Sequence, residues 1–422
     1  MSSVNLSQIE GRFSSAVSGT ISEETRADIV GLLKTAFKDF KIKAEKDSFE
    51  LAKIFYLYGR AIYGGDMVAP HNVLKLSTAL QLAGMEKLDV KLLPSMAECQ
   101  ELDQVAQLQC PNEVDELLMQ GDAEMLADHA EAFSFACSLR WLLHTEQNLK
   151  GLSGNLDRLE KLYGLARAIQ EKVNTPDSKW EVAGIIYNGE RWLVSQKDPE
   201  NIDKALEVLD KLEPFIEREN GSIRSQLLKA QIENMRAKLL GEKIGKATGQ
   251  EKKDLFAKQF DHRSKADKIA TGLTVFGGDQ FLATLFKSNL ISTGLDCLAN
   301  NVNVTNLNDL EYHANSVLND MEREKYSHFY HPLFLINVAQ LKMTKGENIQ
   351  ALKLLNKAAE VNNNYPQNVN FEQVKQAIAS MKGQIGVAPA WWSSRDVLLL
   401  KICITSAVIC VGILTGRGRF RR

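Results

Sequence analysis

Apolar residues recur three and four positions apart along most of this 422-residue chain, as in Leu156, Leu159, Leu162 and Ala166. Spacing of this kind places apolar side chains on one face of an α-helix. Only nine prolines interrupt the chain, and the alternating apolar and polar runs typical of strands are nearly absent. The pattern predicts an all-α fold of roughly sixteen helices, each about 14 to 22 residues long.

Turn-forming residues separate the periodic segments at 64–66, 111–112, 175–177, 220–221 and 362–364. Loops this short join helices that run antiparallel and pack side by side. A series of such pairs forms either a closed bundle or a stacked solenoid. The chain is too long for one simple bundle, so we expect stacked pairs of helices.

Residues 332–366 carry the clearest pattern of two helices packed around a turn. Small residues let two helices approach closely, and a large apolar residue fills the space between them. The residues with this spacing are Val338, Ala339, Gly346, Ala351, Leu355 and Ala358. The segment resembles a tetratricopeptide (TPR) unit, although Pro366 comes later than in that family and Lys342 replaces its usual aromatic residue.

Two further segments resemble the same family more weakly. Residues 183–214 place Gly189 and Trp192 on a first helix and Ala205 and Leu209 on a second, with a longer turn than the family has. Residues 51–82 show a similar pairing with an inserted segment. The resemblance implies TPR-like antiparallel hairpins stacked as a solenoid. The alternative is an irregular all-α domain in which the Ala and Leu spacing reflects core packing alone.

In TPR proteins the first helix of each pair lines a groove that binds a peptide or helix of a partner. The resemblance therefore implies polar partner-binding residues on these helices, and for each of them the alternative is a solvated helix face. The candidates are Asn337, Gln340 and Lys342 on the clearest unit and Tyr187, Asn188 and Arg191 on the second.

The C-terminal segment 397–416 reads VLLLKICITSAVICVGILTG and is followed by RGRFRR. Twenty helical residues span about 30 Å, the thickness of the hydrocarbon core of a bilayer. The sequence therefore predicts a transmembrane helix rather than a buried helix of a globular domain. Aromatic and basic residues suited to the membrane interface flank or enter the span, namely Trp391, Trp392, Lys401, Arg417, Arg419, Arg421 and Arg422.

An anchor at the end of the chain places the preceding residues in the cytosol. The short, moderately apolar and basic tail resembles those of tail-anchored proteins of the mitochondrial outer membrane, with the peroxisome and the endoplasmic reticulum (ER) as alternatives. The predicted organisation is a flexible N-terminus (1–20), a repeat domain (21–382) divisible into 21–240 and 255–382, a juxtamembrane linker (383–396), the transmembrane helix (397–416) and a basic tail (417–422).

Composition argues against several other classes of protein. The net charge is −2 and no basic stripe is present, so we expect no nucleic-acid partner. No CxxC pair occurs, and His328 and His331 lack the further ligands that a metal site needs. The GEKIGKAT segment at 241–248 lacks the spacing of a phosphate-binding loop. We therefore expect no metal and no cofactor.

These features together predict a non-enzymatic adaptor or receptor that recruits protein partners to an organelle surface. The plan resembles that of the much shorter mitochondrial fission adaptors of the Fis family, which join TPR helices to a C-terminal anchor. The alternatives are a peroxisomal or ER tail-anchored recruiter and a membrane-anchored all-α enzyme. The sequence offers no catalytic motif that would favour an enzyme.

Overall fold

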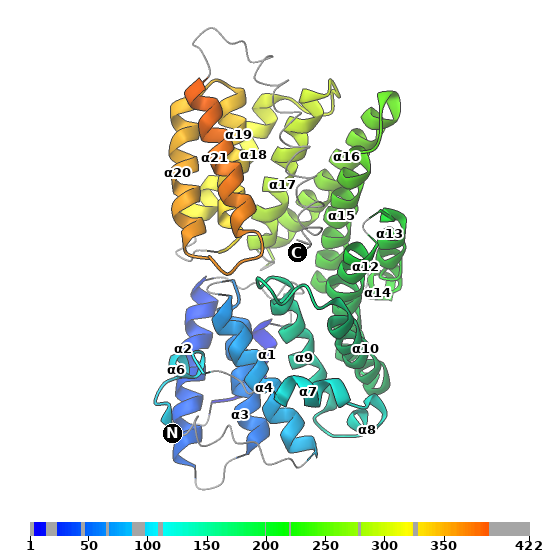
Figure 1. Cartoon of the computed structure of the whole chain (residues 1–422), viewed down its shortest axis with the longest axis vertical. Helices are drawn as coiled ribbons and strands as arrows, with labels where there is room; N and C mark the ends of the chain where they lie inside the picture. Colours follow the sequence, from blue (N-terminus) through cyan, green and yellow to red (C-terminus); the bar gives the residue numbers. More distant parts are fainter. Residues whose placement is uncertain are drawn as a thin grey trace, which may run out of the picture. The chain divides into compact units, whose positions relative to one another are not determined.

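The computed structural model describes residues 4–13, 23–43, 47–64, 67–86, 98–108, 113–198, 200–218, 221–276, 280–323 and 328–387. Within these ranges every regular element is a helix and none is a strand (Figure 1), which confirms the all-α prediction. No helix in these ranges combines the length and the apolar character that a bilayer crossing requires. The predicted transmembrane helix at 397–416 and the basic tail lie outside the described residues.

The chain divides into two compact units. Unit 1 lies within Met1–Asp198 and Glu207–Asn220, and unit 2 lies within Pro199–Leu206 and Gly221–Arg422. The helix α13 (Ile202–Asp210) contributes residues to both units. The helices of unit 1 are α1 (Leu6–Phe13), α2 (Glu23–Ile42), α3 (Ser48–Ile62), α4 (Val68–Glu86), α6 (Leu102–Val105), α7 (Glu113–Gln120), α8 (Ala123–Ala127), α9 (Ala132–Gln147), α10 (Leu156–Val173), α11 (Pro176–Ile185), η1 (Ile186–Glu190), α12 (Arg191–Lys197) and α14 (Glu213–Arg218).

In unit 2 the helices are α15 (Ile223–Ile244), α16 (Gly249–Thr274), α17 (Gln280–Ala299), α18 (Leu307–Arg323), α19 (His331–Thr344), α20 (Asn348–Asn363) and α21 (Phe371–Val387). The turn between α15 and α16 falls inside the GEKIGKAT segment 241–248 and lies within unit 2. The boundary between the two units lies near 199–220, whereas the predicted halves are 21–240 and 255–382. Part of the segment 1–20, predicted to be flexible, is the helix α1.

Local sequence signals explain where several helices of unit 1 begin and end. Asp47 caps α3 by accepting a hydrogen bond from the backbone N–H of Phe49 at 2.8 Å. Asn174 ends α10 in the left-handed conformation, and Thr175 then caps α11, with Pro176 in its first turn. These are residues that favour helix ends because they satisfy exposed backbone groups or fit the required backbone angles. The two helices meet at Asn174 and Thr175, at the start of the predicted break 175–177, and Pro176 and Asp177 already belong to α11.

The predicted first helix of 183–214 is interrupted by the π-helix η1. Gly189 lies in η1 against the aromatic ring of Tyr163 on α10, and a Cβ atom at Gly189 would come within 2.6 Å of that ring. The glycine permits the widened turn to approach α10. The weak TPR resemblance of this segment therefore does not extend to a regular first helix.

Unit 2 is built from consecutive helical pairs. The pairs α15–α16, α17–α18 and α19–α20 pack against each other in chain order, and α19 also contacts both α17 and α21. One core cluster joins α19, α20 and α21 through Ala339, Ala351, Leu355 and Ala358, all fully buried. A second cluster joins α17, α18 and α19 and includes the fully buried Val338. The apolar residues that define the pattern in 332–366 thus lie between helices.

Gly346 forms the turn between α19 and α20 with φ at 80°, a left-handed conformation that residues with a side chain rarely adopt. No atom lies within 4 Å of a Cβ built there. We expect Gly346→Ala to lower the free energy of unfolding by about 1–2 kcal/mol through backbone strain alone. The matched control is Gly272→Ala within α16, which also has open space around its Cβ position and should stabilise by up to about 1 kcal/mol. Urea unfolding followed by circular dichroism of the full chain in detergent compares the two, and equal effects would contradict the expectation.

Candidate functional site

Polar side chains from α15, α16 and α17 meet within unit 2. The guanidinium of Arg263 donates from Nη1 to the backbone oxygen of Asn234 at 2.9 Å and to its side-chain oxygen. Asn289 donates from Nδ2 to the same side-chain oxygen at 3.1 Å. Arg263 and Asn234 are buried, whereas Asn289 is partly exposed. These hydrogen bonds connect α15, α16 and α17 and leave the amide of Asn289 partly exposed.

A second polar contact continues this set to α19. Asn337 donates from Nδ2 to the backbone oxygen of Ser288 at 3.2 Å and to its hydroxyl at 2.9 Å. Ser288 and Asn289 are consecutive residues of α17, so their side chains point about 100° apart around the helix axis. Helix α17 therefore bonds α15 through Asn289 and α19 through Ser288. We call Arg263, Asn234, Asn289, Ser288 and Asn337 the polar row.

The polar row leaves partly exposed amides on neighbouring helices. Asn289 and Ser292 lie one turn apart on α17, and Asn337 and Gln340 lie one turn apart on α19. Each amide carries both donors and acceptors and can bond the backbone of another chain. The backbone oxygen of Gln340 accepts a hydrogen bond from the hydroxyl of Thr344 at 2.9 Å. The partly exposed amides therefore lie on α17 and α19, two helices in contact.

Lys342 is buried, with its ammonium 2.9 Å from Glu311 of α18 and 2.9 Å from Glu347 at the start of α20. Burial opposes the charged form of Lys342, but hydrogen bonds to Glu347 and Glu311 outweigh it and raise its pKa. Lys345 pairs with the same two carboxylates. These contacts favour a structural role in which Lys342 joins α18, α19 and α20, and its binding of a partner remains a prediction.

The second predicted set lies in unit 1 on η1 and at the start of α12. Tyr187 and Arg191 are buried, and Arg191 donates from Nε to the backbone oxygen of Tyr187 at 2.9 Å. The backbone oxygen of Asn188 accepts a hydrogen bond from Gln147 at 3.0 Å. The two predicted sets of partner-binding residues therefore belong to different units. Their roles in partner binding remain predictions.

Other predicted residues are placed as follows. The membrane-interface residues from Trp391 to Arg422 lie outside the described residues. His328 and His331 are buried, and the ring of Phe281 lies 4.2 Å from that of His328. In the part of the chain that the structure describes, no three His, Cys, Asp or Glu side chains are grouped so as to hold a metal ion.

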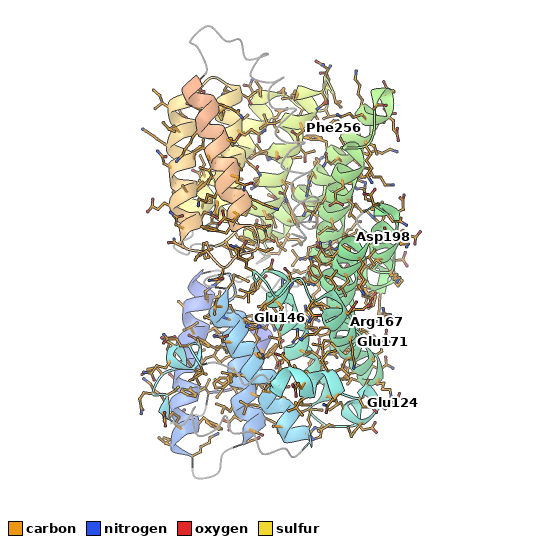
Figure 2. The ribbon with its side chains drawn as sticks, viewed as in Figure 1. Glu124, Glu146, Arg167, Glu171, Asp198 and Phe256 are labelled. Carbon is orange, nitrogen blue, oxygen red and sulfur yellow. The ribbon has the colours of Figure 1, made fainter. Side chains whose placement is uncertain are left out.

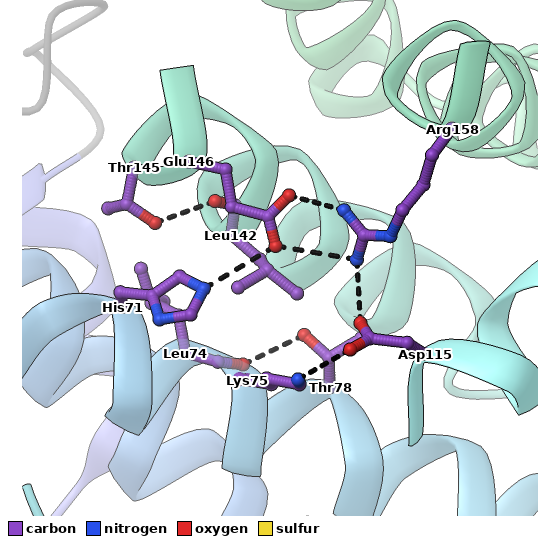
Figure 3. Close-up of polar contacts among 9 residues, drawn as sticks. All are labelled: His71, Leu74, Lys75, Thr78, Asp115, Leu142, Thr145, Glu146 and Arg158. Atoms are coloured by element: carbon purple, nitrogen blue, oxygen red, sulfur yellow. Dashed lines mark hydrogen bonds and ion pairs between the residues drawn. The ribbon is translucent and has the colours of Figure 1, made fainter. Parts of the chain in front are cut away.

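Unit 1 contains an ion network, buried at Glu146 and partly exposed at Asp115, that the sequence patterns did not predict (Figure 3). Arg158 of α10 bonds Glu146 of α9 and donates to Asp115 of α7 at 2.7 Å. Lys75 of α4 pairs with Asp115 at 2.7 Å, and His71 lies 3.4 Å from Glu146. The network joins α4, α7, α9 and α10. These helices are separate in sequence, so no local spacing reveals it.

The charges of this network stabilise one another. Burial opposes ionisation of Glu146, but the hydrogen bond to His71 and the charge of Arg158 outweigh it, and the pKa of Glu146 is held below its usual value. Arg158 experiences the reverse balance, and Glu146 and Asp115 raise its pKa against the effect of burial. Because its charges are paired and hydrogen-bonded, we interpret the network as a structural element rather than a catalytic one.

A contrasting ion pair lies on the surface of the same unit (Figure 2). Arg167 pairs with Glu171 one turn along α10 at 2.7 Å, and it also contacts Glu190. The side chains of Arg167 and Glu171 are about one third and one half exposed. Such solvated pairs contribute at most about 1 kcal/mol because water and salt screen them.

The site assignments therefore depend on contacts between helices that are distant in sequence. The polar row presents partly exposed amides on α17 and α19, and the ion network holds the core of unit 1. No protein-family model matches the chain, and a search of curated proteins finds no significant match.

Proposed function

We propose that this protein is a non-enzymatic adaptor that binds a polypeptide partner on unit 2 and is held at an organelle membrane by residues 397–416. The observation that carries the proposal is the series of packed helical pairs from α17 to α21. In this series α17, α19 and α21 contact in turn, and α18 and α20 each pair with a neighbour. Helices arranged in this way present side chains of every second helix on one common face.

The finer proposal is that unit 2 is a TPR-like solenoid segment. The burial of Val338, Ala339, Ala351, Leu355 and Ala358 between α19 and its neighbours supports it. The left-handed turn at Gly346 supports it as well, since it reverses the chain between α19 and α20 within a few residues. In this proposal α17, α19 and α21 are the first helices of their pairs.

The chemistry of the polar row supports a polypeptide partner. Asn289 and Asn337 are partly exposed and held in place by bonds to Asn234 and Ser288. Fixed amides lose little side-chain entropy when they bond a partner, which favours recognition of backbone groups. The proposal places the binding face on α17 and α19 and includes Asn337 and Gln340, two of the residues that the sequence predicts for partner binding.

The proposed anchor rests on the apolar sequence 397–416 and its basic flanks. Anchoring restricts the protein to a surface and raises its effective concentration toward partners on the same membrane. The composition of the tail favours the mitochondrial outer membrane, with the cytosolic side facing the partner.

The experiment uses the full chain with a fluorescent tag and a biotin ligase at its N-terminus. We expect mitochondrial rims for the chain and a diffuse signal after deletion of 397–422. Ser292→Arg places a bulky charge beside the polar row and should remove specific biotinylated neighbours without changing the location. The control Asn356→Arg alters an exposed position of α20 and should retain them.

Two results would contradict the proposal. A diffuse signal from the full chain would contradict the proposed anchor. Identical biotinylated neighbours for Ser292→Arg and Asn356→Arg would contradict the proposed binding face on α17 and α19. A peroxisomal or reticular signal would keep the adaptor and change its organelle.

A further inference from the structure

Several buried polar atoms of unit 1 have no hydrogen-bond partner among the described residues. Five of them lie on α3, α9 and α10, namely Arg60 Nε, Arg140 Nη1, Trp141 Nε1, His144 Nδ1 and Tyr163 Oη. Arg60, Arg140, Trp141 and Tyr163 are each more than nine tenths buried. Buried polar groups are nearly always hydrogen-bonded, so five such atoms in one unit require an explanation.

Four of these five residues form one group. Trp141 contributes an indole ring, and Arg60, Arg140 and His144 lie around it. The guanidinium carbons of Arg60 and Arg140 each lie 4.9 Å from the ring centroid of Trp141. The ring of His144 lies 5.7 Å away at nearly a right angle. Arg60 comes from α3, whereas the other three follow one another on α9, so the group is a single cluster where two packed helices meet.

Tyr163 of α10 lies beside this cluster, because α9 and α10 pack together and both contact α11 and η1. Burial raises the pKa of Tyr163, and the charge of Arg140 opposes this rise. Glycines of α11 and η1 lie against both side chains. A Cβ atom at Gly184 would come within 3.0 Å of Arg140 Nη1, and one at Gly189 would meet the Tyr163 ring. The π-helix η1 widens the backbone here, and such turns are frequent at functional sites.

The cluster carries more buried positive than negative charge. Arg140 donates from Nε to Glu181 at 2.5 Å. Arg60 has no carboxylate partner among the described residues and donates from Nη1 to the hydroxyl of Tyr56 at 3.1 Å. Aromatic rings compensate a buried guanidinium only in part, and an unpaired buried charge is strongly unfavourable. One further anion would balance the two arginines.

These five atoms are mainly donors. The N–H groups of Arg60 and Arg140 and the indole N–H of Trp141 can only donate, and the hydroxyl of Tyr163 can donate. His144 Nε2 lies 3.0 Å from the hydroxyl of Tyr63, so Nδ1 is also able to donate when Nε2 accepts. A ligand that satisfies this set must supply acceptors and negative charge, which a water molecule supplies less well.

We propose that unit 1 binds a small oxyanion, of the phosphate or carboxylate kind, through Arg60, Arg140, Trp141 and Tyr163. The site is independent of the proposed adaptor face, because it uses residues of unit 1 alone. Arg60 and Arg140 supply the charge, and Trp141 and Tyr163 supply directed N–H and O–H donors.

The test uses Tyr163→Phe, which removes one hydroxyl and keeps the ring. The full chain in non-ionic detergent is titrated calorimetrically with phosphate, sulfate and acetate, each against chloride at equal ionic strength. We expect one saturable site, weakened about fivefold to tenfold in Tyr163→Phe, as the loss of one hydrogen bond predicts. The control Tyr312→Phe removes an exposed hydroxyl of α18 and should leave the affinity unchanged.

A second measurement keeps the test valid if the variant alters folding. The Tyr163 hydroxyl has no partner within unit 1, so Tyr163→Phe should unfold in chloride at the same or a higher urea concentration than the parent chain. Phosphate should raise the parent midpoint more than that of the variant. Binding of phosphate and sulfate alone identifies a phosphate-like ligand, and binding of acetate alone identifies a carboxylate. No saturable binding of any of the three, or equal affinities in Tyr163→Phe and Tyr312→Phe, would overturn the proposal.

Discussion

Replacing Arg158 by methionine is expected to lower the free energy of unfolding of unit 1 by about 3–5 kcal/mol. Arg158 bonds both Glu146 and Asp115, and the Glu146 side chain is only 3% exposed. Removal of the guanidinium leaves a buried carboxylate with His71 as its remaining partner. Breaking a buried pair on one side has a large effect because the remaining charge is neither solvated nor neutralised.

Three variants separate this effect from the loss of packing. Glu146→Gln with Arg158→Met removes both charges and should cost less than the two single changes added together. Arg167→Met removes the same type of side chain from the surface pair with Glu171 and should cost less than about 1 kcal/mol. Tryptophan fluorescence follows urea unfolding of unit 1 through Trp141, Trp180 and Trp192. An Arg158→Met effect no larger than that of Arg167→Met would show that the network does not stabilise the unit.

The helical class and many helix ends could be predicted because they depend on local physics. The apolar period defines the buried face of each helix, and Thr175 with Pro176 marks a start regardless of what surrounds it. The packing residues around Gly346 could be predicted for a similar reason, since Ala339 and Ala351 lie close in sequence and in space.

The buried polar contacts could not be predicted in this way. The sequence predicts Lys342 as a polar residue that lines a groove, yet in the structure its ammonium is buried and pairs with Glu311 of α18 and with Glu347. Glu146 meets Arg158 and His71 only after α4, α9 and α10 have packed. Such pairs depend on tertiary geometry, which one sequence with helical periodicity does not specify.

The stability of unit 1 should fall as the pH is lowered from 7 to 5, chiefly through His144. Burial lowers the pKa of His144 from 6.5 to about 4, and the charges of Arg140 and Arg191 act in the same direction, while a hydrogen bond with Gln147 opposes them. The unfolded chain therefore binds a proton near pH 6.5 that the folded chain accepts only near pH 4. This difference favours unfolding progressively below pH 6.5 and becomes constant below pH 4.

The expected loss is about 2 kcal/mol between pH 7 and pH 5. His144→Gln removes the titrating group and should flatten the dependence in that window, as measured by urea unfolding in phosphate-free buffers of constant chloride. Glu146 acts in a different window. Its pKa is lowered in the folded state, so its contribution is complete above the unfolded value near 4.3 and is lost only as the pH falls further. Parallel stability profiles of the parent chain and the His144→Gln variant between pH 7 and 5 would show that His144 is not held neutral by its surroundings. A variant that loses the slope between pH 7 and 5 but retains the steep loss below pH 4 would assign the first window to His144 and the second to Glu146.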